Sequence, residues 1–240
     1  MEAVSANEGK LEAINTWDNA FLSFGILQWT AGTDTSTGEL PALLERLKQD
    51  YAVIFQELFG RYGLDMQLRP GGFLSKPGFL PGGYFSIDGV VLKTEEQKEK
   101  LRTLEWAYRF WWAGHHDLVR VTQIKQAMGR INTFYRNPSS LLNNRSVADY
   151  VTSECGVALL LDQHVNRPGH VPGTLAKAVD SLSGMGDPQQ WSDADEARLL
   201  DLYVVLREKT TMTDPINRAH VVFEAADKGI LSRRRGSFKE

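Results

Sequence analysis

Apolar side chains recur at helical spacing through most of this chain, and this periodicity limits the fold more than any other feature. Between Glu39 and Gly60 a Leu, Ile or Phe returns every three or four positions, and Pro41 suits the first turn of a helix. Later segments with the same spacing begin at residues that cap or start helices, namely Thr94, Asp117, Ser146, Pro172, Ser192 and Asp214. The spacing predicts a mainly helical protein.

One stretch departs from this pattern. Residues 63–93 contain many glycines and prolines, which break long helices. Within it, the apolar runs 84–87 and 90–92 flank Asp88-Gly89, a pair typical of two-residue hairpin turns. We therefore predict a mainly α (α+β) fold, a helical bundle with one small β-hairpin.

Composition excludes several classes of function. The 27 Lys and Arg against 30 Asp and Glu give a net charge of −3, which does not favour a nucleic-acid partner. The longest apolar runs are far shorter than the roughly 18 residues of a membrane span. Cys155 is the single cysteine, so no intrachain disulfide forms, and no paired metal-ligand spacing accompanies His115-His116. We expect no metal and no cofactor.

The first thirty residues combine acidic, glycine and polar residues in a distinctive order. Glu8-Gly9 is followed by Asp18 ten positions after Glu8 and by Ser23-Phe24-Gly25 fifteen positions after it. Cleavage of a glycosidic bond needs a protonated carboxylic acid for the leaving oxygen and a second polar group, often a carboxylate, for water or for the developing positive charge. Glu8 and Asp18 are the candidates for this pair.

This segment resembles the lysozyme-like superfamily. Glu8-Gly9, Asp18 and Ser23-x-Gly25 are similar to the phage-lysozyme pattern, although a Ser stands where those enzymes carry Thr. Gly25-Ile26-Leu27-Gln28 is similar to the Gly-Leu-Met-Gln motif of goose-type lysozymes and lytic transglycosylases, in which Ser rather than Gly follows the Glu. The resemblance covers about an eighth of the chain. It implies one lysozyme-like domain over 1–240, with the catalytic cleft in 1–93 and a mostly helical lobe in 94–240.

The resemblance also implies roles for particular residues. Glu8 would be the general acid, and Asp18 and Ser23 would assist it. From their own chemistry, Gln28, Trp29 and Thr30 are expected to line the sugar groove. Asn166, in the polar stretch at the end of the most apolar helix, either reaches the cleft or satisfies the end of that helix. Glu12 remains an alternative acid, Asp18 and Ser23 remain candidate turn residues, and Trp29 remains a candidate core residue.

The implied activity is that of a muramidase, which cleaves peptidoglycan glycan strands between N-acetylmuramic acid and N-acetylglucosamine and lyses bacteria. A lytic transglycosylase or a chitosanase using the same Glu, and a wall-binding module without activity, remain open.

Delivery is a separate expectation. Only seven residues precede Glu8, too few for a normal helix, which suggests a domain of a longer protein. No signal peptide is recognisable. We therefore expect delivery by a phage or secretion apparatus to the periplasm or cell wall of a target bacterium. Delivery as an antibacterial effector would imply an immunity protein in the producing cell.

Overall fold

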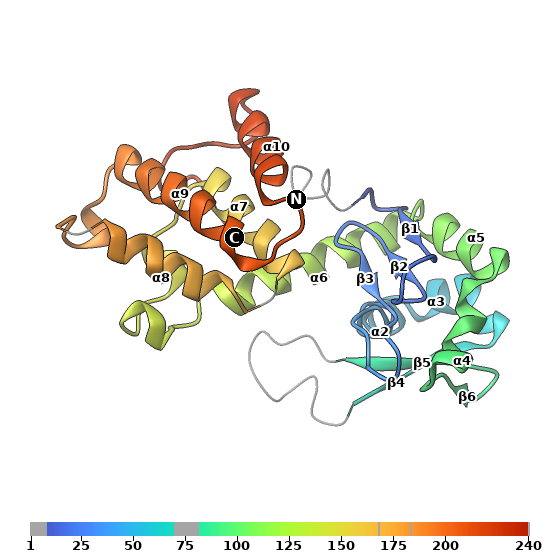
Figure 1. The fold of residues 1–240 in the computed structure, drawn as a ribbon. Helices are drawn as coiled ribbons and strands as arrows, with labels where there is room; N and C mark the ends of the chain where they lie inside the picture. The colour runs from blue at the N-terminus through green and yellow to red at the C-terminus, as the bar shows by residue number, and fades with distance from the viewer. Residues whose placement is uncertain (1–8, 70–81, 168, 183, 240) are drawn as a thin grey trace. The chain divides into compact units, whose positions relative to one another are not determined.

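The chain forms two compact units. The computed structural model describes residues 9–69, 82–167, 169–182 and 184–239, so Glu8 lies outside the described residues. The N-terminal unit falls within Glu8–Arg130 and the C-terminal unit within Ile131–Glu240. Their boundary falls inside one continuous helix, α6 (Asp117–Tyr135), whereas the sequence analysis expects one domain whose parts meet near residue 93 (Figure 1).

The N-terminal unit contains two small antiparallel sheets. The first joins β1 (Ile14–Asn15), β2 (Ser23–Phe24) and β3 (Trp29–Thr30). Sequence analysis did not predict this sheet, because strands of two residues are too short for an alternating pattern to be recognised.

The second sheet contains the predicted hairpin. Strand β5 (Gly83–Ile87) pairs with β6 (Val90–Val91) through Asp88 and Gly89, whose φ values of 49° and 79° are those of a type I′ turn. The hairpin is therefore confirmed. The β4 strand (Leu64–Leu68) pairs with the other edge of β5 and was not predicted, so the expected single hairpin becomes two three-stranded sheets.

Helices surround these sheets. The predicted helix between 39 and 60 is present but interrupted at Tyr51, where ψ is 61°. Thr94 and Gln97 form the expected capping box, although the helix that they start is short and Thr103 caps the next one. The remaining elements of this unit are α2 (Leu40–Asp50), α3 (Ala52–Leu58), η1 (Gly60–Tyr62), α4 (Glu95–Lys98), η2 (Glu99–Arg102), α5 (Leu104–Ala113) and the first part of α6.

Phe110 on α5 is the centre of the N-terminal core. Its fully buried ring lies 5.3 Å from Phe24 of β2, 4.9 Å from Phe59 and 6.3 Å from Phe85 of β5, measured between ring centroids. Because these rings come from both sheets and from the end of α3, one aromatic cluster holds α5 against both sheets. The opposite face of α5 is left toward solvent.

The buried face of α6 differs from the one that the sequence indicates. Its apolar spacing places Val121 and Ile124 inward, yet these side chains are 40% and 41% exposed. The buried positions include Gln123 and Arg130. Arg130 forms an ion pair with Glu39 at 2.6 Å. Polar groups with fixed partners therefore share the buried face of this helix with apolar side chains such as Val119 and Ala127.

The C-terminal unit is built from helices around α7 (Glu154–Asn166). Residues Cys155 to Gln163 of α7 are all buried, which confirms it as the central core helix. Ser146 begins only the short 3-10 turn η4, and α7 begins after Ser153, so the predicted helix start at Ser146 is wrong. The other elements are η3 (Ser140–Leu142), η4 (Val147–Asp149), α8 (Val171–Ser181), η5 (Pro188–Gln190), α9 (Asp193–Arg207), η6 (Glu208–Thr210) and α10 (Pro215–Asp227).

A charged network lies inside this unit. Asp162 of α7 is fully buried and pairs with Arg207 at 3.1 Å and with Arg218 at 2.7 Å. Arg207, also fully buried, donates further hydrogen bonds to the carbonyl oxygens of Leu159 and Pro215. One carboxylate therefore connects α7, α9 and α10.

The last residues of the chain pack against the start of α7. Arg235 pairs with the buried Glu196 at 2.7 Å and also donates to the carbonyl oxygen of Tyr150. The amide of Phe238 donates to the carbonyl oxygen of Thr152. The basic run at 233–235 is thus part of the folded unit. With its helices and two small sheets, the chain has the predicted mainly α, α+β fold.

Candidate functional site

The first sheet has one polar face and one apolar face. Its register aligns Asn15, Ser23 and Thr30 in one row across the three strands. Residues directly opposite each other in an antiparallel sheet point to the same side, so these three side chains share a face. The neighbouring row, which contains Phe24 and Trp29, points to the opposite side and into the core.

This alternation separates the two predicted substrate residues on β3. Trp29 is 1% exposed, so its ring packs in the core rather than lining a groove. Thr30, the next residue, is half-buried and lies on the polar face. Ser23 lies on the same face but is only 3% exposed. The predicted groove residues are thus divided between the two faces, and stacking on sugar would require another aromatic side chain.

Asp18 is held by its neighbours. Asn15 Nδ2 donates to Asp18 Oδ2 at 2.7 Å, and the Ala20 amide donates to Asp18 Oδ1 at 2.9 Å. Arg102 donates to the carbonyl oxygen of the same residue. Asp18 therefore closes the turn after β1, as one interpretation of the sequence expects. Its half-buried carboxylate is also joined to Asn15 of the polar row, and each oxygen keeps a further lone pair for water or substrate.

Gln28 lies beside the residue that follows Glu8. A Cβ on Gly9 would meet Ala13 and approach Gln28 Nε2 to 3.4 Å, so only glycine fits there without displacement. Gln28 Nε2 donates to the carbonyl oxygen of Gly25 at 3.0 Å. The Glu-Gly pair and the Gly-Ile-Leu-Gln motif, separate signals in the sequence, therefore meet at Gly9 and Gln28.

Gln123 of α6 connects the segment after Gly9 to the Gly25–Gln28 motif, and the sequence analysis did not identify it. Its Nε2 donates to the Leu11 carbonyl oxygen at 2.8 Å, and its Oε1 accepts from the Ile26 amide at 3.0 Å. Its side chain is fully buried and packs against Gly25, where a Cβ would collide with it. A buried Gln nearly a hundred residues away gives no local sequence signal. Only the glycine at position 25, with φ of 81°, marks the contact.

We expect Gln123→Glu to introduce a pH-dependent loss of stability. A protonated carboxyl group accepts from Ile26 and donates to Leu11, whereas an ionised one faces the Leu11 carbonyl without a proton. Burial would raise the pKa of the introduced group, so stability is complete below the ordinary Glu pKa and falls as pH rises through the folded-state value. The loss at high pH should be about 1–3 kcal/mol.

Urea unfolding between pH 4 and pH 8 measures this effect. Gln56→Glu, an exposed exchange of the same chemistry on α3, should change stability by less than about 0.5 kcal/mol without the pH step. Equal pH profiles for the two variants would contradict a donor role for the Gln123 amide.

Of the two candidate acids, Glu8 and Glu12, the structure describes only Glu12. Glu8 falls outside the described residues. Glu12 is half-buried, and its backbone lies against Gly114 at the end of α5, where a Cβ would collide with it. Gly9, Asp18, Ser23, Gln28 and Thr30 all belong to the N-terminal unit.

Asn166 belongs to the C-terminal unit, at the last residue of α7. Its Oδ1 accepts a hydrogen bond from the Thr213 amide at 3.2 Å, which ties the helix end to the loop before α10. The structure therefore gives this side chain a structural contact.

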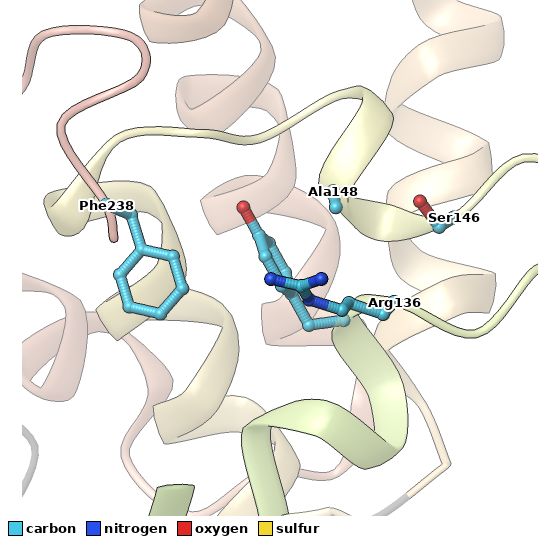
Figure 2. Close-up of a pocket in the computed structure, with 5 residues that line it drawn as sticks. Arg136, Ser146, Ala148 and Phe238 are labelled. Carbon is cyan, nitrogen blue, oxygen red and sulfur yellow. The ribbon is translucent and has the colours of Figure 1, made fainter. Parts of the chain in front are cut away.

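A surface pocket of about 390 Å³ lies elsewhere in the C-terminal unit. Figure 2 shows the Phe238 ring facing Arg136 at the end of α6, with Ser146 and Ala148 on the neighbouring turn. The Tyr135 hydroxyl, also in its lining, donates to the Val151 carbonyl oxygen at 2.9 Å. None of the predicted site residues lines this pocket.

The described part of the chain gives little support for a cysteine nucleophile, a metal site or a membrane-spanning helix. Burial raises the pKa of the Cys155 thiol to about 11, so it stays protonated near neutral pH and is a poor nucleophile. Among residues 9–69, 82–167, 169–182 and 184–239, no three His, Cys, Asp or Glu side chains are grouped to hold a metal ion. Within the same ranges, no helix has the length and apolar character to cross a bilayer.

Comparison of this chain with known protein families, with curated proteins and with solved structures finds no match.

Proposed function

We propose that the N-terminal unit is a peptidoglycan-cleaving glycoside hydrolase, a muramidase, with Glu8 as general acid. The observation that carries the proposal is the polar row Asn15, Ser23 and Thr30 on one face of the first sheet. This row borders the turn that holds Asp18, and its member Ser23 belongs to the sequence motif Glu8-Gly9, Asp18 and Ser23-x-Gly25 that resembles the phage-lysozyme pattern.

The proposed reaction assigns a step to each group. Glu8 donates its proton to the glycosidic oxygen as the bond to the sugar carbon breaks. Asp18, oriented by Asn15 and Ala20, positions the incoming water or balances the positive charge that develops on the sugar ring. Thr30, which is half-buried, offers its hydroxyl group to the sugar from the polar face, and Ser23, only 3% exposed, supports the row from within. No cofactor is required.

Digestion of purified peptidoglycan by the whole chain, with fragments identified by mass spectrometry, tests this proposal. Reducing-end muropeptides are the expected products. Anhydro-ended products would instead identify a lytic transglycosylase, and release from chitosan alone would identify a chitosanase. Binding to the wall without any released fragment would overturn the enzymatic proposal in favour of a wall-binding module.

We further propose that the chain acts in the periplasm or cell wall of a target bacterium after delivery by a phage or secretion apparatus. If it is an antibacterial effector, the producing cell needs an immunity protein that covers the polar face of the first sheet. Production of the chain in the periplasm of a Gram-negative host should then lyse the cells, and production in the same host without a secretion leader should not.

A further inference from the structure

The outer face of α5 carries an exposed aromatic stripe. It consists of Leu104, Tyr108, Trp111 and Trp112, followed by His115 just after the helix. Their spacing places them on one side of the helix. Leu104 is 86% exposed, Tyr108 59%, Trp111 41% and Trp112 55%. A contiguous apolar surface of this kind is uncommon on a monomer and marks a binding surface.

The rings in this stripe contact one another. The Tyr108 and Trp111 ring centroids are 5.9 Å apart, and those of Trp111 and His115 are 4.5 Å apart. His115 Nδ1 also lies 2.9 Å from the Trp111 carbonyl oxygen. On the opposite side of the helix, Phe110 is fixed in the core. Contacts between neighbouring rings and with the helix backbone therefore hold the stripe side chains in place.

The stripe ends at the segment that carries the candidate site. Gly114, which directly follows α5, packs against the backbone of Glu12, and a Cβ there would lie 2.8 Å from the Leu11 carbonyl oxygen. Leu11 is also the residue that Gln123 holds. The C-terminal end of the stripe therefore lies next to the segment at 11–12, close enough for a long ligand in the proposed site to contact both.

The absence of charged side chains from the stripe favours a ligand that presents uncharged rings. The stripe residues include no Lys, Arg, Asp or Glu, and the adjacent Glu105 and Arg109 neutralise each other in an ion pair at 2.7 Å. Proteins that lie on anionic membranes use unpaired basic residues around the apolar face, whereas Arg102 and Arg109 beside this stripe are paired with Glu99 and Glu105. Flat indole and phenol rings instead suit the C–H faces of sugar rings.

We propose that the stripe is an accessory binding site for a polysaccharide, the glycan strand of peptidoglycan, with sugar rings stacked on Trp111 and Trp112. Residues 104–115 extend about 16 Å along the helix axis, enough for several sugar units. This inference rests on the proposed function, because the glycan is that function's substrate. It also supplies the stacking surface that buried Trp29 does not provide.

Binding of the Glu8→Gln chain to purified sacculi, measured by co-sedimentation, tests the inference while the wall stays intact. The double variant Trp111→Ala/Trp112→Ala should bind about tenfold more weakly. Ile216→Ala is the control, because Ile216 on α10 is 58% exposed and lies outside both the stripe and the candidate site. It should bind like the parent chain. Circular dichroism confirms that each variant folds.

Four results would overturn the inference. They are equal sacculus binding by the double variant and its parent, an equal loss of binding in Ile216→Ala, a loss of binding by the double variant to phosphatidylglycerol vesicles but not to sacculi, and a change from dimer to monomer in the double variant. Its failure is distinguishable from failure of the proposed function. If the wild-type chain releases no fragments but the double variant still loses sacculus binding, the stripe binds glycan and the hydrolase proposal fails. If cleavage occurs and the double variant binds normally, the hydrolase proposal stands and the inference about the stripe fails.

Discussion

Glu8→Gln is expected to reduce the release of reducing-end muropeptides about 10²- to 10⁴-fold. Gln has nearly the same size and shape as Glu but carries no proton that it can transfer to the glycosidic oxygen. The loss should appear in kcat, while co-sedimentation with sacculi stays unchanged because the substrate contacts remain. Fragment release from purified peptidoglycan, followed by chromatography, measures the effect.

Two further variants give this experiment its controls. Glu12→Gln keeps the backbone contact with Gly114 and should retain nearly full activity. Asp18→Asn should lose activity partly. Asn15 and Ala20 donate to different oxygens of the carboxylate, and the amide nitrogen that replaces one of these oxygens cannot accept a hydrogen bond. Full activity in Glu8→Gln together with loss in Glu12→Gln would move the general acid to Glu12.

The second large effect concerns stability. Asp162→Ala should lower the free energy of unfolding of the C-terminal unit by about 3–5 kcal/mol. The substitution leaves Arg207 and Arg218 buried without the carboxylate between them, and burying uncompensated charge is costly. Burial already lowers the pKa of Arg207, consistent with this cost.

Urea unfolding followed by circular dichroism measures this change, and hydrogen exchange of the α7 amides assigns it to the C-terminal unit. Glu224→Gln is the matched control, because it breaks the exposed ion pair between Glu224 and Lys228 on α10. It should cost less than about 1 kcal/mol. Similar losses in the two variants would contradict the role of the buried network.

Local signals in the sequence predicted the elements whose structure is set locally. The Thr94 and Gln97 capping box, the Asp88-Gly89 turn and the cap at Ser192 each depend on residues within three positions of one another. Pro215 begins α10 for a similar reason, since its fixed φ suits a first turn. Such features need no knowledge of the rest of the fold.

Features set by distant contacts were not predicted. Val121 and Ile124 follow helical spacing, yet α6 is rotated so that Gln123 and Arg130 reach partners elsewhere in the N-terminal unit. Apolar spacing alone cannot anticipate the buried polar residues that share this face with Val119 and Ala127. The first sheet was missed because pairing, rather than the composition of two-residue strands, defines it.

The candidate site shows the same division. The motif residues Asp18, Ser23, Gln28 and Thr30 were recognised from spacing, and they fall within one small unit. The sequence does not distinguish the two faces of a short strand, so adjacent Trp29 and Thr30 were given one role. The catalytic role of Glu8 stays a prediction.

The packing of Gln123 against Gly25 has an evolutionary consequence. Any side chain at position 25 would enter the space that the Gln123 amide occupies, and a shorter residue at position 123 would leave the Leu11 carbonyl and the Ile26 amide unpaired. Residues 25 and 123 should therefore co-vary among related sequences. In relatives of this chain, departures from Gly at 25 should occur mainly where 123 has also changed.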